Sequence, residues 1–231
     1  MQHRFYTLLV CWFLFIPVCF SQVVWECPLV EKNIQVYDSL KTKIKLKNHE
    51  KLANAVLQYF PLNDDKLISY QYIIKCNKEV NIEEVSECLA QWYKIRMPRI
   101  NPRKDGMVNH LSGAAILNRI GAAAGYMNPT FISAEEEVTI DIKEDRIRVT
   151  LTIPRYMSSS PLSGTQYYSP GAMFPANQKG IHKDGYALAF IICNSTIIND
   201  AKDILEFINN NSSLKFEIKA KQFYAASQRV L

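Results

Sequence analysis

The stretch VTIDIKEDRIRVTLTI, residues 138–153, decides the fold. Apolar side chains occupy every second position on both sides of an acidic dipeptide at 144–145, and charged or hydroxyl side chains fill the positions between them. Such alternation predicts two β-strands with one apolar and one polar face, joined by a two-residue turn. The turn fixes the register, and the pairs we expect are Ile142–Ile147, Ile140–Val149 and Val138–Leu151 on the apolar face, and Asp141–Arg148 and Lys143–Arg146 on the polar face.

The apolar face of this hairpin must be covered, because a lone hairpin is only marginally stable in water. The best partner in the chain is a helix predicted over residues 82–95. Asn81 can cap its first turn, and Pro98 stops it. Its apolar residues recur at three- and four-residue spacings, as a helix that buries one face requires: Ile82, Val85, Leu89 and Trp92.

Further elements are predicted on both sides of this unit. A helix capped by Asn48 is expected over residues 49–60, and an aromatic, β-branched strand over residues 67–76. In the segment 113–124, alanine content favours a helix, whereas the glycines and a short apolar run favour strands, and propensity alone leaves both open. The C-terminal part is expected to form a buried strand at 186–193, a helix capped by Asn199 and a last strand at 214–223.

The first residues have the features of a secretory signal peptide. A short basic start precedes an apolar run that is too short to span a bilayer comfortably, and small residues Cys19 and Ser21 come just before residue 22. An uncleaved membrane anchor is the alternative. We expect no transmembrane segment after the signal. The predicted organisation is a signal peptide at 1–21, a helical lead-in at 22–66, an α+β core at 67–156, a long Ser/Pro/Gly/Tyr loop at 157–185, and a strand–helix–strand extension at 186–231.

Composition is that of an ordinary globular protein, with 48% apolar and 21% charged residues and a net charge of +5. The basic residues are spread along the chain, so no nucleic-acid partner is expected. Four cysteines follow the signal, and in an exported chain an even number permits two disulfides as readily as four buried thiols. Their spacing does not fit a metal site, and we expect no cofactor. These possible disulfide cysteines are Cys27, Cys76, Cys88 and Cys193.

Three stretches together resemble the domain of unknown function 4468 family. SYQYIIKCNKEVNIEEVSECLAQWY is similar to the family's opening strand and helix, which ends near an aromatic pair, here Trp92-Tyr93. LSGAAILNRIGAAAG looks like its glycine-rich strand. VTIDIKEDRIRVTLT is similar to its hairpin, although Glu144 departs from the pattern at the turn. The resemblance covers residues 69–156.

The resemblance implies an α+β fold related to that of the TATA-binding protein. In that fold a curved antiparallel sheet carries helices on one face, and this chain would add N- and C-terminal α/β extensions. It also implies an exported protein of Bacteroidetes-type bacteria, periplasmic or associated with the outer envelope. It favours a strand at 113–124. No activity follows from it, because the family has none assigned.

No catalytic set is visible in the sequence. His110 and His182 are expected in loops, away from any known nucleophile or metal motif. The acidic run 135–137 is interpreted as the solvated entrance to a strand. Arg96, Arg99, Arg103 and Lys104 form a small basic cluster that is either a phosphate or lipid head-group site or the usual basic end of a helix.

The polar hairpin face and the tyrosines of the long loop are the candidate binding surfaces. A half-solvated antiparallel sheet shows the same residue types without any ligand, so the face alone does not establish binding. Tyrosine gives contact area at low entropic cost, which is typical of recognition loops. The candidate binding residues are Lys143, Arg146, Arg148, Thr150, Tyr167 and Tyr168.

We therefore expect a non-enzymatic binding or assembly module of the cell envelope, whose partner is an envelope protein, a glycan or a lipid head group. The first alternative is a small exported hydrolase that uses His110 or His182 with nearby acids. The second is a eukaryotic secreted glycoprotein, with glycan acceptors at Asn194 and Asn211.

Overall fold

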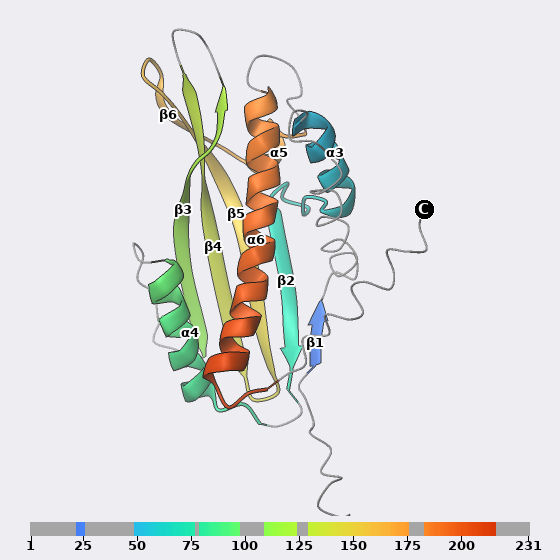
Figure 1. The fold of residues 1–231 in the computed structure, drawn as a ribbon, viewed down its shortest axis with the longest axis vertical. Helices are drawn as coiled ribbons and strands as arrows, with labels where there is room; N and C mark the ends of the chain where they lie inside the picture. The colour runs from blue at the N-terminus through green and yellow to red at the C-terminus, as the bar shows by residue number, and fades with distance from the viewer. Residues whose placement is uncertain are drawn as a thin grey trace, which may run out of the picture.

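The structure, a computed structural model, describes residues 22–25, 49–76, 79–97, 109–123, 129–175 and 183–215. These residues form a curved six-stranded antiparallel sheet with helices on one face, so the expected α+β fold class is confirmed (Figure 1). The elements in chain order are β1 (Gln22–Trp25), α3 (His49–Tyr59), β2 (Ile68–Lys75), α4 (Ile82–Arg96), β3 (His110–Ala123), β4 (Thr130–Lys143), β5 (Arg146–Ser160), β6 (Gly164–Tyr168), α5 (Pro170–Met173) and α6 (Lys183–Asn211).

The hairpin of residues 138–153 lies at the centre of the sheet. The strand order is β1-β2-β5-β4-β3, so β4 and β5 are flanked by strands on both sides. Every pair predicted from the two-residue turn is confirmed, including Ile142 opposite Ile147 and Asp141 opposite Arg148. The ambiguous segment 113–124 belongs to β3 as far as Ala123, which confirms the strand that the resemblance favoured.

A bulge in β5 allows one strand edge to serve two partners. Opposite residues 135–137 of β4, β5 carries an extra residue at the position of Pro154, which has no N–H for the ladder. Before the bulge β5 pairs with β2 as far as Ile153, and after it β5 pairs with β6 from Tyr156 onward. The predicted loop 157–185 is therefore wrong over most of its described length, because residues 157–168 extend the sheet as a hairpin.

The strand predicted at 186–193 is also wrong. These residues lie in α6, a single helix of 29 residues that continues through Asn199, where a new helix was expected to begin. Figure 1 shows α6 running lengthwise over the sheet. It comes close to β3 at a pair of glycines: a Cβ on Gly185 would lie 2.8 Å from the carbonyl oxygen of Ala122, and a Cβ on Gly121 would overlap the carbonyl oxygen of Gly185.

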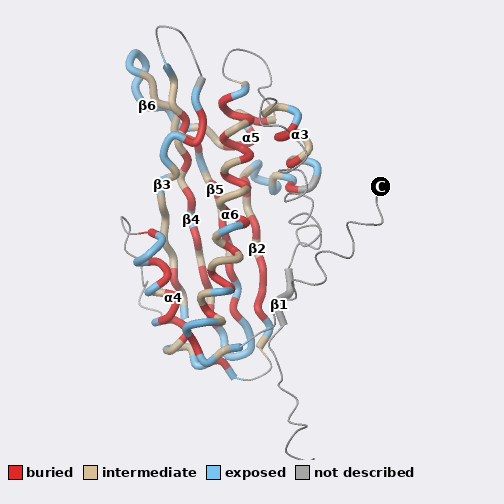
Figure 2. The backbone as a smooth tube through the Cα atoms, viewed as in Figure 1, coloured by how far each residue is buried: buried red, intermediate tan, exposed pale blue. Residues whose placement is uncertain are grey.

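The core lies between the sheet and these helices, as the buried segments of Figure 2 show. The helix at 82–95 is confirmed as α4, and the Asn81 side chain accepts a hydrogen bond from the Glu84 amide at its N-cap. However, α4 covers only part of the hairpin: its Tyr93 hydroxyl donates to the carbonyl oxygen of Val138 at 2.8 Å, and its ring lies against Gly113. Helix α6 covers much of the remainder, which the sequence analysis missed because it divided this helix.

Several predictions fall outside the described residues. These are the signal peptide at 1–21, the Asn48 cap, and residues 216–223 of the predicted last strand. Within the described part of the chain, no helix is both long enough and apolar enough to cross a membrane.

Candidate functional site: the open face of the sheet

The face of the sheet that points away from α4 and α6 is here called the open face. Side-chain alternation places every second residue of each strand on it. The strand registers arrange these residues in rows that run across β2, β5, β4 and β3. The successive rows are Lys75–Arg146–Lys143, Ile73–Arg148–Asp141–His110, Gln71–Thr150–Thr139–Ser112, Ser69–Thr152–Glu137–Ala114 and, beyond the β5 bulge, Arg155–Glu135–Ile116.

The first row places three cations side by side at one end of the open face. Lys75, Arg146 and Lys143 come from three neighbouring strands and oppose one another in the registers. Like charges directly opposite one another destabilise a sheet by a few tenths of a kcal/mol or more. Among the described residues, the Asp145 carboxylate offsets part of this repulsion, with its Oδ1 3.6 Å from Nε of Arg146. A negatively charged group bound at this end of the sheet would therefore reduce the repulsion among the three cations.

The second row contains an ordered histidine–aspartate pair. His110 Nδ1 lies 2.6 Å from Asp141 Oδ1. His110 begins β3, so its expected placement in a loop is wrong. The cation opposite this pair is Arg148, and within the described residues it has no ion-pair partner.

Hydroxyl and amide groups, with one exposed carboxylate at Glu137, occupy the middle of the open face. Ser69 Oγ and Thr152 Oγ1 are hydrogen-bonded to each other at 3.0 Å across β2 and β5. The side chains of Gln71, Thr139 and Thr150 are partly exposed. This area offers both donors and acceptors at the spacing of β-strands, which suits a ligand with many hydroxyl groups.

The far end of the open face combines an ion pair with an aromatic ring. The Arg155 guanidinium is bonded to the Glu135 carboxylate, which raises the pKa of Arg155, and it lies 5.1 Å above the ring centre of Tyr167. Tyr168 is not part of this surface. It pairs with Tyr156, a buried residue of the helix-covered face. Of the candidate binding residues, Lys143, Arg146, Arg148 and Thr150 lie together, Tyr167 lies beyond them, and Tyr168 lies on the other face.

Beneath the sheet, on the helix side, the structure holds one buried acid and one partly buried acid that the sequence analysis missed. Glu136 is only 2% exposed and faces Asp200 of α6. Burial, and then the nearby Asp200 charge, raise the pKa of Glu136, while burial raises the pKa of Asp200 as well. The solvated entrance predicted for residues 135–137 is thus wrong for Glu136. Its position in the alternation, between core residues Ala134 and Val138, was the signal that could have shown this.

The other residues singled out in the sequence have structural roles or lie outside the described ranges. Cys76, Cys88 and Cys193 are free thiols, and Cys27 is not described, so any disulfide with it stays a prediction. Arg96 is bonded to Asp203 of α6 at 2.7 Å, whereas Arg99, Arg103, Lys104 and His182 are not described. Among the described residues, no cluster of side chains has the arrangement of a metal site.

Asn194 does not fit the role of a glycan acceptor. Its side chain is fully buried in α6. The amide nitrogen donates to the carbonyl oxygen of Phe190 at 2.7 Å, and the amide oxygen accepts a hydrogen bond from the Tyr70 hydroxyl. A bound glycan would displace both bonds and open the core.

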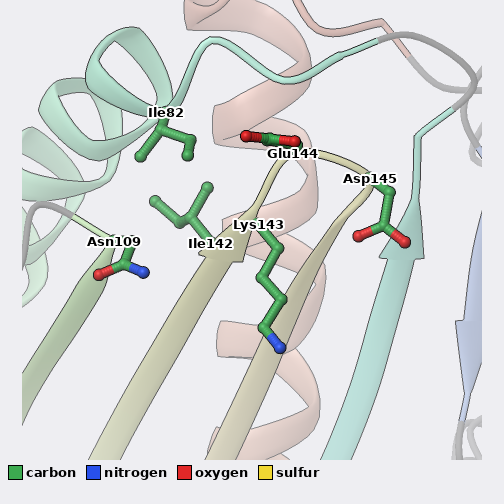
Figure 3. A pocket seen from close by; sticks show the side chains of 6 residues that line it. All are labelled: Ile82, Asn109, Ile142, Lys143, Glu144 and Asp145. Carbon is green, nitrogen blue, oxygen red and sulfur yellow. The ribbon is translucent and has the colours of Figure 1, made fainter.

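A shallow pocket lies between the β4–β5 turn and the start of α4. It has a volume of about 370 Å³ and is lined by Ile82, Asn109, Ile142, Lys143, Glu144 and Asp145 (Figure 3). In Figure 3 the Lys143 side chain points away from Ile82 and Ile142, along the strands. With two acids at its rim and no buried charged group, this pocket lacks the convergent polar groups of a typical small-molecule site.

No protein-family model matches the sequence, and no curated protein matches it either. Two solved structures are similar. A TBP-like protein from Parabacteroides distasonis is 13% identical, with a TM-score of 0.45, covering 66% of this chain and 99% of its own. A DUF4468 family protein from Bacteroides ovatus is 10% identical, with a TM-score of 0.40, covering 63% of this chain and 90% of its own. Both are of the kinds that the sequence motifs resemble. Such low identities carry no residue roles over to this chain.

Proposed function

We propose that this chain is a non-enzymatic binding module of the bacterial cell envelope, and that it binds an acidic glycan on the open face of its sheet. The observation that supports the proposal most is the open face itself. Its middle is lined mainly by hydroxyl and amide groups, with a single carboxylate at Glu137, and one end carries the cations Lys75, Arg146, Lys143 and Arg148.

The chemistry of this face favours a glycan over a protein. Protein interfaces depend on a few aromatic or aliphatic anchors near their centre. The large exposed apolar residues among the described ones are Ile95, Ile116, Leu162 and Tyr167, and none lies in the hydroxyl-rich rows. Ile73 is the one large apolar side chain in the cationic rows, and it is only 9% exposed. A hydroxyl-rich polyanion satisfies both the polar rows and the cations.

The proposal is tested by NMR titration of residues 22–231, the chain without its predicted signal peptide. The ligand is oligogalacturonate, a hydroxyl-rich polyanion, and neutral dextran oligomers are the matched control. We expect the amide signals of Gln71, Thr139 and Thr150 to shift with oligogalacturonate and to respond far less to dextran. Raising the salt concentration should weaken the effect, because exposed charges are screened.

A matched pair of variants locates the binding surface. Arg148→Gln should weaken binding about tenfold to a hundredfold, since a hydrogen bond to a charged group contributes about 1.5–3 kcal/mol. Lys94→Gln removes an exposed cation from α4 instead, and should leave the affinity unchanged. Equal losses in the two variants, or shifts confined to residues outside the open face, would exclude this surface.

A hydrolase remains the second candidate, because the His110–Asp141 pair has the geometry that orients a catalytic base. Within the described residues, however, no hydroxyl or thiol is hydrogen-bonded to His110 Nε2. Steady release of reducing ends from oligogalacturonate, abolished in His110→Asn, would favour this candidate over simple binding.

A further inference from the structure

The two ends of the open face differ in charge. At one end, its first two rows carry four cations and a single carboxylate, that of Asp141, which is bonded to His110. The adjoining turn adds the acids Glu144 and Asp145, and within the described residues only Asp145 forms an ion pair with one of the four cations. An acidic group of a ligand is therefore attracted to this end. The four cations are Lys75, Arg146, Lys143 and Arg148.

In the next charged rows, carboxylates outnumber cations. Glu137 is exposed in the fourth row, and Glu135 follows in the next row along β4. The cation there is Arg155, whose guanidinium is bonded to Glu135, so that its one charge serves two carboxylates. Glu137 has no ion pair of its own among the described residues. A second acidic group of a ligand would thus meet repulsion here, whereas an uncharged sugar would not.

We infer that the glycan bound on the open face carries its acidic group at one end only. That group lies on the cationic rows, and neutral sugars lie over the middle of the face, toward the exposed ring of Tyr167. This inference rests on the proposed function and specifies the class of ligand, a neutral oligosaccharide capped by an acidic sugar. Figure 1 shows the β4–β5 turn and β6 at opposite ends of the sheet, so such a ligand would lie along the strands.

The spacing of the rows separates the two charged regions. Glu137 lies opposite Thr152, which is four residues along β5 from Arg148. At the rise of a β-strand this separation is about 13 Å, which exceeds the Debye length of about 8 Å at physiological salt. An acid bound at Arg148 is therefore largely screened from Glu137. A glycan with an acid on every sugar cannot avoid this repulsion, because its next carboxylates come closer to Glu137.

The test compares two ligands of equal length by isothermal titration calorimetry with residues 22–231. In linear aldotetraouronic acid a single glucuronic acid caps a chain of neutral xylose, whereas tetragalacturonate carries an acid on every sugar. We expect aldotetraouronic acid to bind the wild-type protein at least as tightly, although it carries fewer charges. Glu137→Gln should raise the affinity for tetragalacturonate about twofold to fivefold relative to that for aldotetraouronic acid, which is the range for exposed charge pairs.

Glu87→Gln is the matched control, because it removes an exposed carboxylate from α4, on the other side of the sheet. It should leave the ratio of the two affinities unchanged. Three results would overturn the inference while the proposed function stands: an equal gain for both ligands in Glu137→Gln, no gain for either, or tighter binding of tetragalacturonate by the wild type. If neither ligand binds the wild-type protein, the proposed function fails and the inference fails with it.

Discussion

The buried glutamate beneath the sheet makes a testable link between pH and stability. Glu136 is almost completely buried between β4 and α6, and one of its carboxyl oxygens has no hydrogen-bond partner among the described residues. The titratable groups that face Glu136 come from α6. The Asp200 carboxylate repels an ionised Glu136, and the Cys193 thiol is also close to it. Arg96 of α4 acts on Asp200 in the opposite sense. The net result is a pKa of Glu136 raised well above its ordinary value.

Proton binding determines whether the free energy of unfolding rises or falls with pH. In the unfolded chain a glutamate has a pKa of about 4.3, so above that pH it is ionised. In the folded chain Glu136 keeps its proton over a wider range. Between the two pKa values the folded state therefore binds one more proton, and the free energy of unfolding falls as pH rises. The stability that this group contributes is fully present below the unfolded pKa and is lost as pH rises through the folded pKa.

The magnitude is about 1.4 kcal/mol for each pH unit within this window. A rise of two units, from pH 5.5 to 7.5, should thus lower the free energy of unfolding by about 2.7 kcal/mol through this one group. With a urea m-value of about 2–3 kcal/mol/M, the unfolding midpoint should drop by about 1 M.

The assay is urea unfolding followed by tryptophan fluorescence at a series of pH values. Glu136→Gln cannot ionise, so it should remove this slope and be the more stable protein at pH 7.5. Glu137→Gln, the exposed neighbour on the open face, is the matched control and should keep the wild-type slope. If Glu136→Gln loses stability with pH as steeply as the wild type, the reasoning about its protonation is refuted.

Two further predictions concern how α6 is held on the sheet. Gly121→Ala should lower the free energy of unfolding by about 1–3 kcal/mol or more, because its Cβ would overlap the carbonyl oxygen of Gly185. The control is Gly164→Ala, which has open space around it and only an unfavourable φ of 68°. It should lower the free energy of unfolding by about 1 kcal/mol in the same urea assay. Tyr70→Phe should cost about 1–3 kcal/mol, since it leaves the buried amide oxygen of Asn194 without its donor, and a loss no larger than that of a surface substitution would contradict the hydrogen bond.

The central hairpin and α4 could be predicted because local signals agreed. Strict alternation with a two-residue turn admits one register, and Asn81 with the acidic first turn defines the start of α4. The order of these elements was enough to suggest the fold class. The polar residues of the hairpin were also placed correctly on one face, because side chains alternate between the two faces along each strand.

Helix α6 was missed because its first half, YALAFIIC, is apolar at every position. A short run of this kind fits a buried strand or a buried helix equally well. The helical spacing becomes visible only over the whole element, where buried residues recur at Phe190, Ile197, Ala201 and Ile208. Placing a cap at Asn199 cut this pattern in two.

The long loop was mispredicted for a related reason. Serines at 158–160 and the glycine at 164 read as irregular chain, yet they form the end of β5 and the start of β6, where pairing with a neighbouring strand outweighs weak β-propensity. The rows of the open face could not be predicted either, because they depend on how β2 and β3 pair with the hairpin, and no local signal sets that pairing.

The most direct test of the account is the accessibility of a single thiol on the open face. Thr150→Cys places that thiol in the middle of the hydroxyl-rich rows, and the buried native Cys193 serves as an internal reference on the opposite face. With labelling followed by peptide mass mapping, we expect fast modification at position 150 in the free protein, protection by oligogalacturonate, and no modification of Cys193 in either case. A thiol at position 150 that labels as slowly as Cys193, or at the same rate with and without oligogalacturonate, would contradict an open, glycan-binding face.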